Sequence, residues 1–301
     1  MLTFPGQDER AAEIRHDLAK EFDFAERVFE FWMRALKDEW LAKCSLPPIV
    51  TRGTAMPLNT QACRLFQSLL ECCNRADAFS ADILARSLFE TLLATCFVLQ
   101  KEFSYLPALV PQGAPIEAEQ RLPEDLRAKL YMSFQALRTK RHGARLATDE
   151  RFQALATTVA DRYPPIVFER IASELDPEWI KVLTKAPTYS GLKINELAIT
   201  LGHIYEYWYS SFYFLQSRNA HGADAVQHVN DYFGPLYFSD GVDTCTALYA
   251  GTSMFILCIR TAHEYIHFGD EVTRRFDELY REYDTLWSPT IRQPSTAHRD
   301  A

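Results

Sequence analysis

The sequence has little glycine, with 11 glycines among 301 residues, and few stretches in which apolar and polar residues alternate. Alternation with a period of two marks a half-buried strand, and glycine is common in the tight turns that connect strands. The chain is instead rich in Leu, Ala, Glu and Arg, which favour helices. We therefore expect an all-α fold.

An excess of positive charge is also missing, because 40 Asp and Glu residues outweigh 32 Lys and Arg residues and give a net charge of −8. Binding to nucleic acid without regard to sequence requires a broad basic surface, so this class of function is excluded. A local basic pocket is still allowed. The most basic stretch, Thr139–Arg145, is interpreted as a solvated helix end with a loop, and a phosphate-binding role is the alternative.

Signals for secretion or membrane insertion are absent as well. The first residues contain no apolar run of signal-peptide length, and the longest uncharged run, Thr244–Ile259, is shorter than the roughly 20 apolar residues that cross a bilayer. The 7 cysteines are odd in number and include no CxxC pair, which indicates reduced, structural thiols. We expect a cytoplasmic protein with no membrane partner.

No glycine-rich phosphate loop, GxSxG elbow, kinase signature or zinc-ribbon spacing occurs in the sequence. No motif therefore fixes a reaction, and the sequence leaves open whether the chain is an enzyme.

Apolar residues recur with a helical period along most of the chain. This pattern predicts one bundle-like domain over residues 1–287, with a long N-terminal helix at 7–45, a long C-terminal segment broken or kinked near Gly269, and a flexible tail at 288–301. A central helix is expected at Ser80–Glu102, with Ser80 as its N-cap. Further helices are expected at Leu58–Asn74 and at 124–142, 149–163, 165–175 and 177–185, and an irregular connector at 103–123.

Two charged residues, Arg86 and Glu90, interrupt the otherwise apolar central helix. They are one helical turn apart and point in the same direction as apolar neighbours, so we expect them to face the protein interior and to pair with each other or with another buried group. Because apolar replacements of buried ion pairs are often neutral or stabilising, the pair indicates a role beyond stability.

A second polar cluster ends the aromatic stretch Tyr205–Gly222, in which seven of the ten residues 205–214 are aromatic. On a helix, Tyr213, Ser217 and His221 follow one another on one side, with Arg218 one turn before His221. Gly222 is a typical helix stop, which would place the imidazole where the helix dipole favours its protonated form.

The RSLFE sequence of Arg86–Glu90, followed by YSGL at Tyr189–Leu192 and by the tyrosine-rich helix ending in Ser217 and His221, resembles domain of unknown function 5677 over residues of about 60–270. That family consists of mainly bacterial, all-helical proteins without an assigned role. The resemblance implies that Arg86, Glu90, Ser217 and His221 are recurring polar features. Tyr189 stands where the family pattern has tryptophan.

The Arg218–His221 segment looks like a contracted form of the motif of HEPN (higher eukaryotes and prokaryotes nucleotide-binding) ribonucleases, with only two residues between arginine and histidine. In that class, arginine stabilises phosphate charge and histidine acts as an acid or base on the ribose hydroxyl. The hypothesis that follows is a metal-independent ribonuclease in stress or phage defence, with Arg86, Glu90 and His221 in one pocket and Arg218 in a secondary role.

The sequence also contains His263-Glu264-Tyr265-Ile266-His267, an HExxH motif within a helical pattern. In zinc hydrolases the two histidines bind the metal and the glutamate acts as base. A helical bundle can also gather Glu90, His221, His263 and His267 around a metal. We expect no cofactor, and zinc or another divalent metal is the alternative.

A non-catalytic module that binds a ligand or partner is the remaining alternative, with Arg86 available to an anion and the aromatic segment forming pocket walls. The expected partners are RNA or a small anionic ligand, and a second copy of the chain is a further candidate.

Overall fold

The computed structural model describes residues 7–40, 49–100, 124–155, 170–213 and 241–292. Every regular element in these ranges is a helix, which confirms the all-α prediction. The chain divides into two compact units, a first unit of residues 1–46, 59–92 and 208–301 and a second unit of residues 47–58 and 93–207. The single-domain assignment of residues 1–287 stays a prediction.

The N-terminal helical run consists of α1 (Gln7–Asp17), α2 (Ala19–Ala35) and the π-helix η1 (Leu36–Trp40). The long helix expected at 7–45 is interrupted at Leu18, whose backbone angles are φ −104° and ψ 27°. Helical hydrogen bonds still cross this point, from Leu18 N to the Ile14 carbonyl and from Phe22 N to the Leu18 carbonyl. Residues 41–45 lie outside the described ranges.

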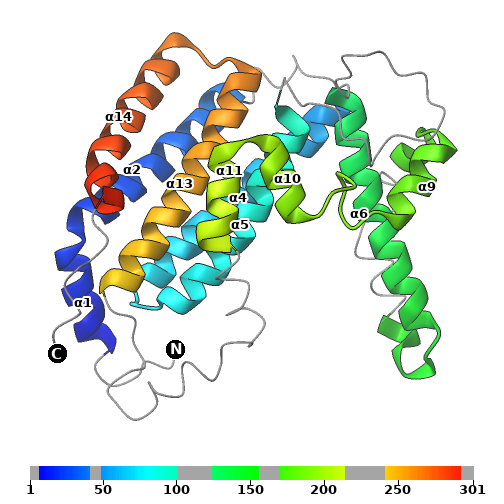
Figure 1. Ribbon diagram of the computed structural model, residues 1–301, viewed down its shortest axis with the longest axis horizontal. Helices are drawn as coiled ribbons and strands as arrows, with labels where there is room; N and C mark the ends of the chain where they lie inside the picture. Colours follow the sequence, from blue (N-terminus) through cyan, green and yellow to red (C-terminus); the bar gives the residue numbers. More distant parts are fainter. Residues whose placement is uncertain (1–6, 41–48, 101–123, 156–169, 214–240, 293–301) are drawn as a thin grey trace. The chain divides into compact units, whose positions relative to one another are not determined.

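The core of the first unit is α13 (Gly241–Ile266), which runs alongside α2 and α14 (Asp270–Arg292) (Figure 1). The break expected near Gly269 separates α13 from α14, and the Gly269 amide donates to Glu39 Oε2 at 2.8 Å. Because α14 continues to Arg292, residues 288–292 are helical and not part of a tail. Residues 293–301 lie outside the described ranges.

The apolar surface of α13 is covered by protein. This helix has the length and mean hydropathy, 1.4, of a candidate membrane span, but 72% of that window is buried inside the structure. Phe255 of α13 stacks on Phe66 of α4 (Ile49–Cys73) with ring centroids 4.3 Å apart. The buried hydroxyls of Thr252 and Thr261 donate to carbonyls one turn earlier in the same helix, so their polarity is satisfied locally.

Two predicted helix starts are wrong. The helix expected from Leu58 begins at Ile49 and passes through Pro57, although proline cannot donate the usual helical hydrogen bond. The central helix, α5 (Ala78–Leu99), begins before Ser80, because the Asp77 carboxylate accepts from the Ser80 amide at 3.0 Å and caps the helix. The sequence pattern identified the apolar segments correctly and misplaced their first turns.

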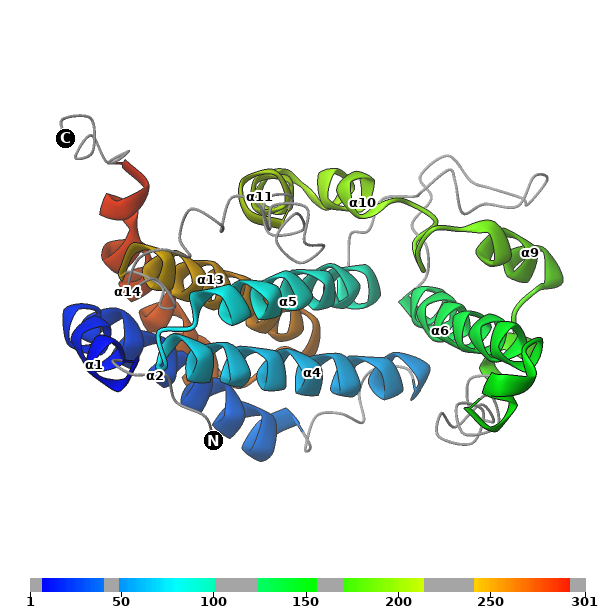
Figure 2. The same cartoon turned by 90° about the horizontal axis from the view of Figure 1, so that it is seen from below.

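The second unit contains α6 (Glu124–Ala147) and α9 (Pro177–Lys185), which lie side by side (Figure 2). The prediction for 177–185 is confirmed, with the Asp176 side chain accepting from the Glu178 amide at 2.8 Å. In contrast, α6 continues past His142 to Ala147. The basic stretch Thr139–Arg145 is therefore helical throughout, and its interpretation as a helix end with a loop is wrong.

The second unit also contains the 3-10 helix η3 (Glu150–Phe152), α10 (Ile194–Leu201) and all but the last residue of α11 (His203–Trp208). The π-helix η4 (Tyr209–Tyr213), which follows α11, belongs to the first unit. The segment 149–163 is described only to residue 155 and the segment 165–175 only from residue 170. The connector at 103–123 lies outside the described ranges.

The cysteines of the described residues form no disulfide. Burial raises the pKa of the Cys63 thiol to about 12, and it raises the pKa of Cys73 further still. Both side chains therefore remain protonated and poorly nucleophilic, as expected of structural thiols.

The close approach of α13 to α4 at Gly251 gives a matched pair of glycine variants. A Cβ at Gly251 would lie 2.5 Å from Cδ1 of Leu69, whose side chain is fully buried, whereas a Cβ at Gly143 would meet nothing within 4 Å. We expect Gly251→Ala to lower the free energy of unfolding by about 1–3 kcal/mol through overpacking. Gly143→Ala should raise it by roughly 0.5–1 kcal/mol through helix propensity.

Urea denaturation of both variants measures the two effects. Equal stabilisation by the two substitutions would show that Leu69 can move aside and that the close approach does not constrain the helices.

Candidate active site

Arg86 and Glu90 lie one turn apart on α5, and Arg86 Nη2 is 3.5 Å from Glu90 Oε1. Glu90 is therefore a partner of Arg86, which is one of the two arrangements that the sequence left open. The predicted burial is wrong, because the side chains are 21% and 46% exposed. Removing both ions from water would cost more than their attraction returns, and the pair accordingly lies at the edge of the apolar face of α5.

Tyr213, the last residue of η4, joins the two charged side chains. Its hydroxyl donates to Glu90 Oε1 at 2.8 Å and accepts from Arg86 Nη2 at 3.4 Å. The ring also lies under the Arg86 guanidinium, 5.2 Å from Cζ to the centroid, and against Phe89 at 5.3 Å. We refer to Arg86, Glu90 and Tyr213 as the Arg–Tyr–Glu cluster.

The helical spacing places Tyr213 on the same side as Ser217 and His221, but it does not predict that Tyr213 is a site residue. The aromatic density of residues 205–214 was the available signal, but seven aromatic residues compete for that role and the sequence does not rank them. The structure shows which tyrosine contacts the ion pair. Tyr213 is buried at the end of η4, whereas Tyr207 on α11 is 47% exposed.

The electrostatics of the cluster assign a role to each group. Burial raises the pKa of Tyr213 above its ordinary value; the Arg86 hydrogen bond opposes this shift and the Glu90 carboxylate supports it. The phenol is therefore a proton donor at neutral pH. Glu90 is an accessible carboxylate that can accept a proton, and Arg86 is a fixed cation that can bind an anion.

The other residues of the predicted histidine centre, Ser217, Arg218 and His221, lie outside the described residues. The helix expected at 205–222 begins at His203 and becomes a π-helix at Tyr209. A turn at Gly202, with φ 116°, separates it from α10.

The HExxH residues are distributed differently from those of a zinc helix. The α13 helix ends at Ile266, and His267 follows it in the left-handed region with φ 54°. Glu264 faces Arg260, with 2.7 Å between Oε1 and Nε, and the His263 ring lies 5.6 Å from Phe268 and 5.8 Å from Phe276. Within the described ranges no three His, Cys, Asp or Glu side chains form a group able to hold a metal.

The YSGL sequence has a structural role in the second unit. Gly191 has φ 77°, and the Ser190 hydroxyl accepts from the Leu192 amide at 3.3 Å, so the motif forms a tight turn. Tyr189 packs against Phe97 at 5.2 Å and Tyr131 at 4.9 Å. The turn therefore anchors an aromatic cluster and brings no reactive group to the surface.

Among the residues that the structure describes, the charged side chain that is fully buried is that of Arg127, which is 1% exposed. Its Nη1 donates to the Phe97 carbonyl at 2.8 Å, near the C-terminus of α5, where a cation also complements the helix dipole. The burial of Arg127 was not predicted from the sequence. The signal was its position on the stripe of α6 that contains the buried Leu130 and Phe134.

Comparison with known proteins identifies one family. The model of the Family of unknown function (DUF5677) matches residues 54–235, a range that contains Arg86, Glu90 and Tyr213 and excludes His263, Glu264 and His267. No curated protein and no solved structure matches the chain.

The raised pKa of Tyr213 predicts a specific change at high pH. Because the folded state binds the phenolic proton more tightly than the unfolded state, the contribution of Tyr213 to stability is complete below about pH 10 and is lost as the pH rises through its raised pKa. Tyr213→Phe cannot titrate, so its free energy of unfolding should fall less steeply between about pH 9 and pH 11. At neutral pH we expect a difference of about 1 kcal/mol or less.

Urea denaturation at each pH checks this expectation. Tyr209→Phe is the matched control, because it removes a hydroxyl from the same π-helix without touching the ion pair, and it should follow the parent protein. Identical alkaline slopes for Tyr213→Phe and the parent would contradict the assignment.

Proposed function

The chain belongs to the family of unknown function DUF5677, and from that premise we propose that it is a metal-independent ribonuclease whose catalytic residues are Arg86, Glu90 and Tyr213. The observation that supports the proposal is the Tyr213 hydroxyl, which lies 2.8 Å from Glu90 Oε1 and 3.4 Å from Arg86 Nη2. A proton donor from η4 thus contacts a proton acceptor and a cation that lie one turn apart on α5.

These three groups suffice for transfer of a phosphodiester to the neighbouring ribose hydroxyl. Glu90 would remove the 2′-hydroxyl proton as the O2′–P bond forms, and Tyr213 would protonate the 5′-oxygen as the P–O5′ bond breaks. The Glu90 proton then returns to the phenolate through their hydrogen bond, which restores the cluster. Arg86 would stabilise the charge that develops on the phosphate oxygens.

The sequence adds His221 as a second acid or base and Ser217 and Arg218 as neighbouring polar groups, because they follow Tyr213 in the chain. The proposed setting is the bacterial cytoplasm, in stress or phage defence, with RNA as substrate and a second copy of the chain as a candidate partner. This setting follows from the likeness of Arg218–His221 to the HEPN motif and from the composition.

A binding module without catalysis is the second candidate, because the same partly exposed Arg86 can hold an anion without cleaving it. The two candidates differ in the role of Glu90. Catalysis requires its carboxylate as a base, whereas binding of an anion would improve when the negative charge beside Arg86 is removed.

Cleavage of a structured RNA in the presence of EDTA tests the proposal. We expect Glu90→Gln and Tyr213→Phe each to slow cleavage by about 10²–10⁴-fold, the usual contribution of acid–base groups. Arg86→Ala and His221→Ala should also abolish most of the activity. Glu30→Gln is the matched control, because Glu30 forms an exposed pair with Arg34 at the same spacing and the same 3.5 Å distance; it should cleave normally.

Cleavage that persists at the parent rate in Glu90→Gln, Tyr213→Phe and His221→Ala would refute the ribonuclease. If no RNA is cleaved and an anion raises the melting temperature of the parent but not of Arg86→Ala, the binding module is the correct function.

A further inference from the structure

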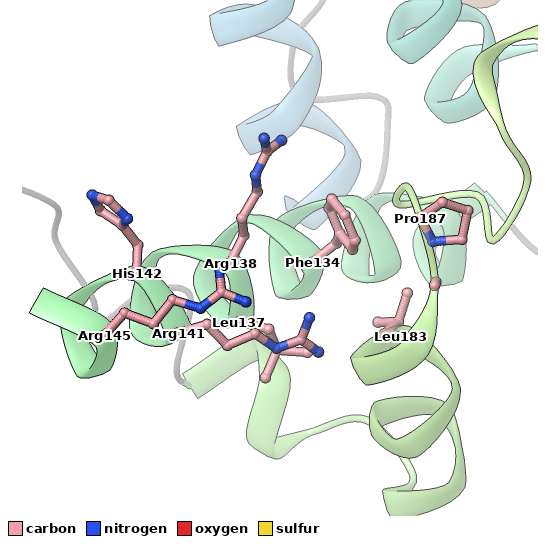
Figure 3. Close-up of a pocket in the computed structure, with 9 residues that line it drawn as sticks. Phe134, Leu137, Arg138, Arg141, His142, Arg145, Leu183 and Pro187 are labelled. Carbon is pink, nitrogen blue, oxygen red and sulfur yellow. The ribbon is translucent and has the colours of Figure 1, made fainter. Parts of the chain in front are cut away.

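A pocket of about 570 Å³ lies in the second unit, between α6 and the end of α9. Four of the residues that line it are basic and come from α6, namely Arg138, Arg141, His142 and Arg145. Figure 3 shows these side chains leaving α6, with Phe134 beside them and Leu183 and Pro187 facing the pocket from the α9 side. The pocket thus combines a cationic wall with an apolar one.

The four basic residues have the spacing i, i+3, i+4 and i+7, which places them on one face of the helix in a row of roughly 10 Å. Like charges at these spacings repel each other. Across the part of the chain that the structure describes, no carboxylate forms an ion pair with Arg138, Arg141 or Arg145. The chain has a net charge of −8, yet none of the acidic residues that the structure describes neutralises this row of arginines.

The same face of α6 is apolar where protein covers it. Arg138 is eleven residues after Arg127 and Arg145 eleven residues after Phe134, and eleven residues are close to three full helical turns. Arg127 and Phe134 are buried, whereas Arg138 and Arg145 are exposed at the pocket. The stripe therefore changes from groups that pack in the core to groups that meet a ligand.

We propose that this pocket binds a small ligand with two or more adjoining phosphate groups, such as a nucleoside triphosphate. The guanidinium fork matches phosphate oxygens two at a time, and three arginines in a row can follow successive phosphates. The volume lies within the usual range of about 300–1,000 Å³ for small-molecule sites. The apolar wall of Phe134, Leu183 and Pro187 would contact the nucleoside.

This site is separate from the Arg–Tyr–Glu cluster and does not depend on the ribonuclease proposal. The same phosphate chemistry is available from a free nucleotide and from the 5′-triphosphate end of an RNA. Arg141 also donates to the Thr184 carbonyl and so helps to hold α9 against α6. The side chains of Arg138 and Arg145 form no such bond with the described residues, so they are the better positions to substitute.

Calorimetric titration of the full chain tests the proposal with ATP, inorganic tripolyphosphate, and a short RNA carrying either a 5′-triphosphate or a 5′-hydroxyl. We expect ATP and tripolyphosphate to bind, and Arg138→Gln and Arg145→Gln each to weaken binding by about tenfold or more, the usual effect of a charge-assisted hydrogen bond. Lys140→Gln makes the same charge change on α6 outside the pocket and should bind as the parent does.

Arg145→Lys keeps the charge but loses the fork, so it should fall between the parent and Arg145→Gln. This conservative variant provides the comparison if a glutamine variant does not fold. Binding of the triphosphorylated RNA alone would identify an RNA end as the source of the phosphates. The proposal is overturned if neither ATP nor tripolyphosphate nor triphosphorylated RNA binds, if Lys140→Gln weakens binding equally, or if the 5′-hydroxyl RNA binds as tightly as the triphosphorylated one.

Discussion

Burial of α13 is the constraint on which the first unit depends. This helix is apolar on nearly every side, so water must be excluded from its whole circumference. Helices α2 and α14 cover part of it, and α4 approaches closely enough that Gly251 leaves no room for a side chain beside Leu69. Several hydroxyls inside α13, including those of Thr252 and Thr261, are tolerated because they donate to a carbonyl of their own helix.

The same constraint explains why charge is found at the edges of the unit. The Arg86–Glu90 pair on α5 remains partly exposed to water. The ring of Tyr213 lies against the Arg86 guanidinium, and its hydroxyl donates to Glu90. A wholly buried pair would have required further donors and acceptors to offset desolvation. In this half-exposed arrangement the Glu90 carboxylate is accessible from solvent while Tyr213 holds the Arg86 guanidinium in place. A fully buried ion pair would not be accessible to a substrate.

The sequence predicted the features that arise from strong periodic patterns. The all-helical fold, the break near Gly269, the extent of α9 and the pairing of Arg86 with Glu90 each rest on spacing within one segment, and each is present. What could not be predicted depends on tertiary packing. Pro57 lies inside α4 despite its missing donor, and Asp77 competes with Ser80 for the cap.

The burial of the arginines shows the same limit more sharply. Arg86 interrupts an otherwise apolar helix, so its side chain was expected to be buried. Arg127 follows a polar helix start, and no burial was predicted for it. The structure reverses the two. Arg127 donates to a backbone carbonyl at the end of another helix, whereas Arg86 contacts a partly exposed carboxylate one turn away and the Tyr213 hydroxyl. Which cation is buried is thus decided by the acceptor that another element supplies. A helix pattern cannot contain that information.

Helix α6 carries both a buried arginine and exposed arginines on the same face. Its core-facing stripe begins with Arg127, whose Nη1 donates to the Phe97 carbonyl. The stripe continues through apolar residues to Phe134 and ends with Arg138 and Arg145. Packing alone would favour apolar side chains at the last two positions as well, since α9 lies alongside. The exposed arginines keep this end of the stripe cationic. Arg127 has an acceptor from the protein in the Phe97 carbonyl, whereas no described carboxylate pairs with Arg138 or Arg145, so a bound anion or water can take the place of that acceptor.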